Sequence, residues 1–267
     1  QATRYIDTAI PHIPVTAHGL KENGYATIAT TNWLPYSWSI NNVAFAEVMH
    51  TALSYFQAGR ADAGYKLLKS SVLDGMYLGD SPGNFGQISF YDAARGECYR
   101  DFGDPIGVAS RVLIQGLFGI LPDALNQQII LRPGFPDDWD KASVSTPDIS
   151  YRFTRKEDTD TYHITQRFQT PLHPVLQINA RKEKIRSVKV NGVPATWQSI
   201  ESAHGYPLLS IQAEGTSSTT ITIEWEGAPL HTLAVQEPVI TSNGKLALQI
   251  PSGASISQVY DPQSVLA

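Results

Sequence analysis

Five carboxylates of this chain share one segment, and carboxyl groups are the side chains that acid–base chemistry at a glycosidic bond needs. The segment covers residues 79–104 and carries Asp80, Asp92, Glu97, Asp101 and Asp104. Hydrolysis of a glycosidic bond needs one carboxyl group that stays protonated and a second that is ionised. Arg100 can hold a neighbouring carboxylate ionised or bind an acidic sugar. We therefore treat residues 79–104 as a candidate catalytic loop.

Simpler roles also account for carboxylates of this loop. Asp104 precedes Pro105 at the start of an apolar helical pattern, so helix capping explains it fully. Asp92 suits a turn. For Glu97, a solvated surface position and a catalytic role weigh equally. The loop is long for a helix connection, which favours a functional segment or a disordered one.

A second loop, residues 30–42, gathers aromatic rings and amides ahead of a helix. Rings stack on the C–H faces of sugars, and amides bond their hydroxyl groups. The rings could instead plug the core, and for Asn42 a helix cap is the stronger alternative. Candidate binding residues are Trp33, Tyr36, Trp38, Asn41 and Asn42.

Glu47 follows about one turn into the next helix, whose apolar positions surround it. An unpaired carboxylate inside such a helix is costly, which favours a paired or functional group. We expect Glu47 to shape the pocket or to make a structural hydrogen bond rather than to donate the proton.

The elements that must position these loops are helices. Residues 43–58 are apolar almost all round and predict a buried helix; residues 60–77 carry one apolar stripe and predict a half-exposed helix. Gly59 between them predicts a helical hairpin. A third helix should begin at Asp104 and run to about residue 120, with Ile106, Ala109, Leu113, Leu117 and Ile120 on its buried face. Residues 1–24 read as a polar loop.

After a Pro-rich stretch near residues 122–148 the apolar period changes to two. Residues 149–153 and 161–166 alternate apolar and polar side chains, and Asn191-Gly192 predicts a tight hairpin. Further short strands follow, with a second hairpin expected at Asn243-Gly244. These patterns predict an antiparallel β-sandwich. Its tryptophans and a tyrosine, Trp197, Trp225 and Tyr206, favour core packing over surface sugar stacking.

The segment between helices and strands resembles the exit from the helical toroid of bacterial six-hairpin glycosidases. In this sequence the similar run consists of Leu131, Pro133, Gly134, Phe135, Pro136 and Trp139. The similarity covers roughly residues 30–225 and is strongest to glycosidase-like proteins of Bacteroides-type gut bacteria. It implies an α+β multidomain fold: the last hairpins of an (α/α)6 toroid in residues 1–125, then a β-sandwich in residues 126–267, truncated at its end.

The resemblance also implies a function, that of a glycoside hydrolase acting on a plant or host glycan. Its catalytic base comes from the loop before the last inner helix, which points to Glu97 first and Asp101 second. The partner acid belongs to an upstream hairpin, so the missing N-terminal part of the same protein is an expected partner. No cofactor is implied, and an extracytoplasmic, periplasmic location is expected.

Composition excludes several other classes. The net charge is −5 with no basic run, which disfavours nucleic acid and anionic membranes as partners, and no apolar stretch is long enough to span a bilayer. The single cysteine, Cys98, excludes an internal disulfide, and no pair of the seven histidines has the spacing of a zinc site.

Two alternatives to hydrolysis remain open. A polysaccharide lyase of toroid and sandwich type would need a base and neutralising groups, for which Tyr99, Arg100 and Asn42 are available. A glycan-binding module without catalytic activity is the other alternative.

Overall fold

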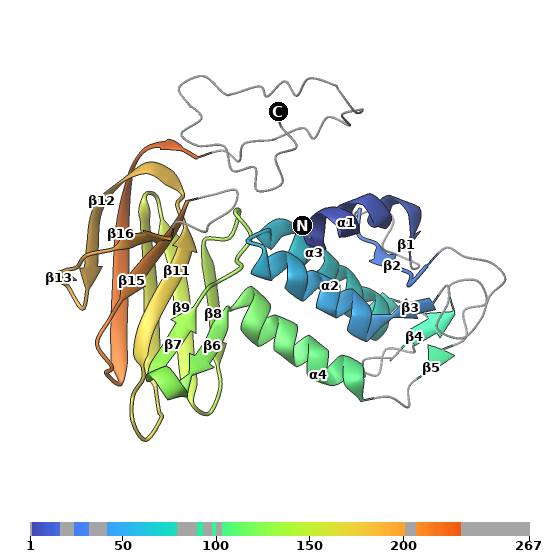
Figure 1. Ribbon diagram of the computed structural model, residues 1–267, viewed down its shortest axis with the longest axis horizontal. Coiled ribbons are helices and arrows are strands. Elements are labelled where there is room, and N and C mark those ends of the chain that lie inside the picture. Colours follow the sequence, from blue (N-terminus) through green and yellow to red (C-terminus); the bar gives the residue numbers. More distant parts are fainter. Residues whose placement is uncertain are drawn as a thin grey trace, which may run out of the picture.

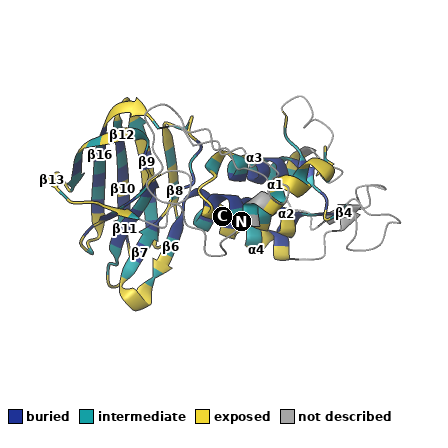
Figure 2. Ribbon diagram, turned by 45° about the horizontal axis from the view of Figure 1, so that its top comes forward, coloured by how far each residue is buried: buried dark blue, intermediate teal, exposed yellow. Residues whose placement is uncertain are grey.

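The structure is a computed structural model that describes residues 2–16, 24–31, 42–78, 90–92, 98–99, 103–200 and 207–230. Helices pack on one side of the molecule, and two β-sheets form the other side (Figure 1). Buried residues concentrate between the two sheets and on the inner faces of the helices (Figure 2). The described part is thus a mixed α+β fold.

The helical part is built around an antiparallel hairpin. Helix α2 (Phe45–Gln57) and helix α3 (Ala61–Val72) meet at Gly59, whose positive φ of 73° lets the chain reverse. This confirms the predicted hairpin. The remaining helical segments are α1 (Ala2–Ala9), η1 (Ile10–His12), the π-helical η3 (Leu73–Leu78), α4 (Asp104–Arg111) and the π-helical η4 (Val112–Leu117).

Three local expectations about the helices are wrong. Residues 2–9 are helical rather than a loop. Asn42 does not cap α2, because it lies in strand β3 and Ala44 occupies the capping position. Asp104 does not cap α4 either, because it is already inside the helix, and Gly103 precedes it without a side-chain cap.

The buried face of α4 and η4 also differs from the expected one. Leu117 is buried as expected, but Ile106 is 59% exposed and Leu113 is 41% exposed. The buried side instead includes Pro105 and Val112.

Two small sheets flank the helices. Strand β1 (Pro14–Val15) pairs with β2 (Thr27–Ile28). Strand β3 (Asn42–Ala44) pairs with β4 (Phe90–Asp92), which in turn pairs with β5 (Cys98–Tyr99). The β3–β4–β5 sheet lies at the end of the helical part that is farthest from the large sheets (Figure 1).

The large sheets form a β-sandwich. One has the order β13-β12-β16-β10-β9-β8 and the other the order β14-β15-β11-β7-β6. Their strands are β6 (Ile120–Asp123), β7 (Gln128–Leu131), β8 (Lys141–Ser145), β9 (Ile149–Lys156), β10 (Thr159–Gln166), β11 (His173–Asn179), β12 (Lys182–Val190), β13 (Val193–Pro194), β14 (Gln198–Ile200), β15 (Leu208–Gln212) and β16 (Ser218–Pro229), with a 3₁₀ turn, η5 (Ala124–Asn126), between the first two.

The predicted alternation matches the strands of the sandwich. Tyr151 and Phe153 of β9 and Ile164 of β10 all point into the core. Asn191 and Gly192 both have positive φ and join β12 to β13, which confirms the tight hairpin.

Two features of the sandwich depart from a simple antiparallel design. Strands β7 and β11 run parallel, so the sheet that contains them is not purely antiparallel. The same sheet already includes Ile120–Asp123, which lies on the helical side of the domain boundary expected at residue 125. The Pro-rich stretch therefore contributes strands to the sandwich rather than acting as a free linker. Asn243-Gly244, which was expected to form another hairpin, lies outside the described residues.

The ring of Phe56 packs where the helical part meets the sandwich. A Cβ atom added to Gly116 of η4 would lie 2.7 Å from the ring of Phe56, and one added to Gly64 of α3 would lie 3.0 Å from it. A Cβ atom on Gly134, in the joint, would clash with the same ring. Gly134 N–H also donates to the Leu117 carbonyl oxygen at 3.0 Å. Three glycines from three segments thus make room for Phe56.

The aromatic residues of the joint extend this contact. Trp139 packs edge-on against Tyr65 of α3, with ring centroids 4.9 Å apart, and Phe135 stacks on Phe153 of β9 at 5.1 Å. The run that resembles the exit of a toroid is therefore a packed interface between helices and sandwich.

Candidate functional site

Most of the residues predicted for the site lie outside the described part of the chain. These are Trp33, Tyr36, Trp38, Asn41, Glu97, Arg100 and Asp101. The described members are Asn42 and Glu47. The geometry of the candidate site is therefore built from the described residues that border the two loops.

The β3–β4–β5 sheet brings the borders of the two loops together. Asn42, the first described residue after the aromatic loop, lies opposite Asp92 of the acidic loop. Cys98, which follows Glu97 in the sequence, lies opposite Tyr91. Antiparallel neighbours are only about 5 Å apart. Segments that are some 50 residues apart in the sequence thus share one sheet.

The backbone of Asn42 is also hydrogen-bonded to Thr30, on the side away from β4. Its N–H donates to Thr30 Oγ1 at 3.2 Å, and its carbonyl oxygen accepts from the Thr30 N–H at 2.7 Å. Asn42 is therefore held between β4 and the segment that follows β2, and its side chain is presented in a defined position.

The side chain of Asn42 is buried without a partner for its carbonyl oxygen. The residue is 2% exposed, and its Oδ1 accepts no hydrogen bond from the residues that the structure describes. If the Asn42 amide group were flipped, its nitrogen would take the position of Oδ1, so that position would still hold a polar atom. A buried polar atom left unpaired costs about 1–3 kcal/mol, which calls for a reason.

A buried acid lies beneath this region and was not predicted. Asp74 of η3 is fully buried, and Thr27 Oγ1 donates to its Oδ2 at 2.9 Å. The sequence carried a signal for it, since Leu67, Ser71 and Asp74 follow each other at the spacing of one helix face. All three are buried. The bond links η3 to β2, because Thr27 belongs to β2. Thr27 lies three residues before Thr30, the partner of Asn42.

Glu47 is exposed, which corrects the reason for selecting it. Helix α2 is buried on most of its surface, but the side chain of Glu47 points to solvent. The cost of burying a charge therefore does not apply to it. Its position in the first turn places a negative charge beside the positive end of the helix dipole, which is a stabilising arrangement.

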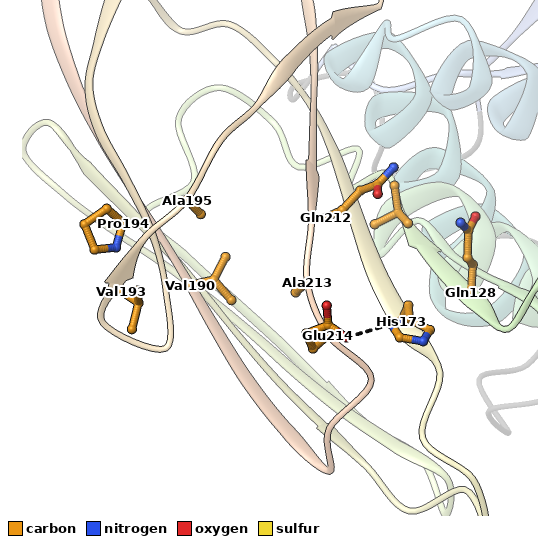
Figure 3. Close-up of a pocket in the computed structure, with 10 residues that line it drawn as sticks. Gln128, His173, Val190, Val193, Pro194, Ala195, Gln212, Ala213 and Glu214 are labelled. Atoms are coloured by element: carbon orange, nitrogen blue, oxygen red, sulfur yellow. Dashed lines mark ion pairs between the residues drawn. The ribbon is translucent and has the colours of Figure 1, made fainter.

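The sandwich has a hollow of its own, beside the ends of strands β7, β11, β12 and β15 (Figure 3). Its volume is about 320 Å³, and Gln128, His173, Gln212 and Glu214 are its polar lining residues. Glu214 Oε2 lies 3.7 Å from His173 Nδ1 but is 92% exposed, and that nitrogen also accepts the Gly215 N–H at 3.0 Å. Because Nδ1 already accepts the Gly215 N–H and Glu214 is largely exposed, the pair is a weak surface interaction rather than an acid–base dyad.

The sandwich tryptophans have different environments. Trp225 is 1% exposed and belongs to the core, as predicted. Trp197 is 42% exposed, so its expected core position is wrong. It lies between two short edge strands, β13 and β14, where alternation does not report a buried face. Tyr206 lies outside the described residues.

The described residues form neither a metal site nor a membrane-spanning helix. No three side chains of His, Cys, Asp or Glu within them are grouped so that they could hold a metal ion. Among the described helices, none has the length and apolar character needed to cross a bilayer.

Comparisons with known proteins give only partial likenesses. No family model matches the sequence, and no curated protein matches it. The α-L-rhamnosidase of Dictyoglumus thermophilum is similar over 68% of this chain and 21% of its own, with a TM-score of 0.43 and 12% identity. The Streptomyces avermitilis α-L-rhamnosidase, solved with L-rhamnose, is similar over 67% of this chain and 18% of its own (TM-score 0.42, 16% identity).

A GH127 β-L-arabinofuranosidase from Geobacillus stearothermophilus T6 is similar over 81% of this chain and 37% of its own, with a TM-score of 0.35 and 8% identity. This chain spans about a fifth of the length of the two rhamnosidases. At these TM-scores and identities we draw no argument about function from the likenesses.

Proposed function

We propose that this chain is the C-terminal part of a glycoside hydrolase of the six-hairpin toroid type, followed by its β-sandwich. The enzyme would hydrolyse a glycosidic bond of a plant or host glycan and act outside the cytoplasm, in the periplasm. The observation that carries the proposal is the β3–β4–β5 sheet, which joins the end of the aromatic loop to the acidic loop.

In this proposal the acidic loop supplies the catalytic base. Glu97 precedes β5 directly and is the first candidate, with Asp101 second; Arg100 between them favours an ionised carboxylate. The base would activate water or attack the sugar. The general acid would come from an upstream hairpin of the same protein.

The aromatic loop would bind the sugar. Trp33, Tyr36 and Trp38 would stack on its faces, and Asn41 would bond its hydroxyl groups. The unpartnered Oδ1 of Asn42 supports this role, because a sugar hydroxyl could donate the missing hydrogen bond. Glu47 is exposed near the start of α2 and would lie at the margin of the sugar-binding pocket.

The proposal is tested by the substitution Glu97→Gln in the full-length protein, assayed on a glycan that the unchanged protein cleaves. Loss of a catalytic base should lower kcat by about 10²–10⁴-fold. The matched control is Glu214→Gln, which removes a carboxylate that is 92% exposed in the sandwich and should leave kcat unchanged. Full activity of the Glu97→Gln variant would remove Glu97 from the mechanism.

The position of Tyr99 favours a second candidate function, that of a polysaccharide lyase. Tyr99, its candidate base, belongs to β5 and therefore to the same small sheet as Asn42. A lyase releases an unsaturated product that absorbs ultraviolet light, whereas a hydrolase does not. Tight oligosaccharide binding without cleavage by either route would instead support a glycan-binding module.

A further inference from the structure

A second candidate site lies where the helical hairpin meets the sandwich. The cavity there has a volume of about 830 Å³. We call it the junction cavity and define it by its described lining residues: Phe56–Ala63 at the turn of the hairpin, Arg132–Phe135 and Asp137 in the joint, and Phe153, Arg155, Asp160, Tyr162, Gln177–Arg181, Ile200, Leu208, Pro229 and Leu230 in the sandwich. Its volume falls within the range of small-molecule sites.

The junction cavity is separate from the candidate catalytic loops. Helix α2 starts beside β3 and ends at the turn that lines the cavity (Figure 1). Its 13 residues span about 20 Å at 1.5 Å per residue. A ligand in the cavity would therefore not touch the β3–β4–β5 sheet.

One wall of the cavity is a fixed network of charges around Asp160. Asp160 is 2% exposed; it accepts from Arg155 Nε at 2.9 Å and from Trp225 Nε1 at 2.9 Å, and Arg181 Nε lies 3.4 Å away. Arg155 also donates to the Asp137 carbonyl oxygen at 2.9 Å, and Arg181 donates to that of Glu157 at 3.0 Å. These contacts hold both guanidinium groups in place at the cavity wall.

The hairpin and the joint add further polar groups to the lining of the cavity. Asp62 of α3 accepts the Asp137 N–H at 3.3 Å, so the two carboxylates come from different parts of the fold and lie close together. Burial, followed by the nearby negative charge of Asp62, raises the pKa of Asp137. Arg132 donates to Gln177 Oε1 at 3.0 Å. Phe135, which is half-buried, adds an apolar surface.

The charges of the cavity balance. Its described lining residues include the guanidinium groups of Arg60, Arg132, Arg155 and Arg181 and the carboxylates of Asp62, Asp137 and Asp160. Asp7, which does not line the cavity, pairs with Arg60 and neutralises its charge. The three remaining guanidinium groups and the three lining carboxylates offer donors and acceptors side by side. Such a lining suits hydroxyl groups, since each hydroxyl both donates and accepts.

We propose that the junction cavity binds a neutral sugar unit at a site separate from the catalytic loops. The guanidinium and carboxylate groups bond its hydroxyls, and the ring of Phe135 contacts its apolar face. The site rests on contacts between the hairpin, the joint and the sandwich, so it stands whether or not the chain has hydrolase activity.

The test uses the 267-residue chain labelled with ¹⁵N and follows the indole N–H signal of Trp225. This N–H donates to Asp160, a wall residue, so it reports on the cavity rather than on the catalytic loops. The probes are D-glucose, D-galactose and L-rhamnose, with D-glucuronate as a charged comparison. At least one neutral sugar should shift the Trp225 signal to saturation, and glucuronate should bind no more tightly.

Two substitutions locate the binding. Arg132→Leu removes an exposed guanidinium of the cavity and should weaken binding by about tenfold, since a hydrogen bond from a charged group is lost. Arg152→Leu is the matched control, because Arg152 is exposed on β9 and does not line the cavity; its affinity should equal that of the unchanged chain. Glu97→Gln should also leave the Trp225 titration unchanged.

Three results would overturn the proposal. They are a Trp225 signal that no neutral sugar shifts to saturation, tighter binding of glucuronate than of every neutral sugar, and equal affinity of the Arg132→Leu and Arg152→Leu variants. None of them bears on hydrolysis, which the Glu97→Gln assay tests separately.

Discussion

Asp160 and Asn42 are both buried polar residues, but they differ in their hydrogen-bond partners. The carboxylate of Asp160 is bonded by Arg155 and Trp225 and lies next to Arg181, so its burial is compensated. The Oδ1 of Asn42 is equally buried and accepts no hydrogen bond from the described residues. A structural role explains Asp160. For Asn42, the proposed function supplies the partner, a hydroxyl group of the sugar.

The difference leads to a prediction for Asn42→Ala. The substitution removes an Oδ1 that accepts no hydrogen bond from the described residues, so the melting temperature should fall less than it does in Asn191→Ala, where a bonded Oδ1 is lost. If Oδ1 binds the substrate, kcat/KM of the full-length protein should fall by about tenfold, as for one lost hydrogen bond. Thermal unfolding and glycan turnover measure the two effects separately.

Asn191→Ala is the control for this prediction. Asn191 has a positive φ, and its Oδ1 accepts the Thr220 N–H at 2.8 Å. This variant should lose stability and keep its activity. If Asn42→Ala behaved in the same way, Asn42 would be a structural residue.

Among the elements, the hairpin and the joint depend on one close contact. Phe56 of α2 lies against Gly64 of α3, Gly116 of η4 and Gly134 of the joint. Protein interiors leave no free space for an added methyl group at such a place. The three glycines are therefore required by packing.

We predict that Gly116→Ala lowers the free energy of unfolding by about 1–3 kcal/mol, because its Cβ would meet the Phe56 ring at 2.7 Å. Gly107→Ala in α4 is the matched control, since nothing lies within 4 Å of its added Cβ. It should stabilise the helix by about 0.5–1 kcal/mol. Urea unfolding of both variants measures the difference. Equal effects would mean that Phe56 does not fill the space beside Gly116.

The whole molecule shows one face that its own described residues do not cover. Ile106 and Leu113 were expected on the buried face of the third helix, yet both are exposed. In the proposed toroid, inner helices are covered by neighbouring hairpins. Ile106 and Leu113 would then be exposed in this chain and buried in the full-length protein, where upstream hairpins would cover them.

This reading predicts different labelling in two forms of the protein. In a Cys98→Ser background, Ile106→Cys and Leu113→Cys should react quickly with a thiol reagent in the 267-residue chain and much more slowly in the full-length protein. Val193→Cys is the control, because Val193 is 64% exposed in the sandwich and should react quickly in both. Rapid labelling of all three positions in the full-length protein would contradict the toroid.

The sequence by itself determined the elements whose pattern is local. The hairpin at Gly59, the alternation of β9 and β10 and the turn at Asn191-Gly192 each follow from backbone sterics and from a period that is written in neighbouring residues. The two chemically rich loops were also evident from their residue types. Their roles remain predictions, because most of their residues lie outside the described part of the chain.

Only the tertiary structure decided what depends on distant residues. It placed Asn42 in a strand because Asp92 and Thr30 offer its backbone partners, and a cap cannot compete with a paired strand. It exposed Glu47, buried Asp74 and assembled the junction cavity from three parts of the chain. The physical reason is that hydrogen-bond pairing and burial are set by neighbours in space, while a sequence pattern reports only neighbours along the chain.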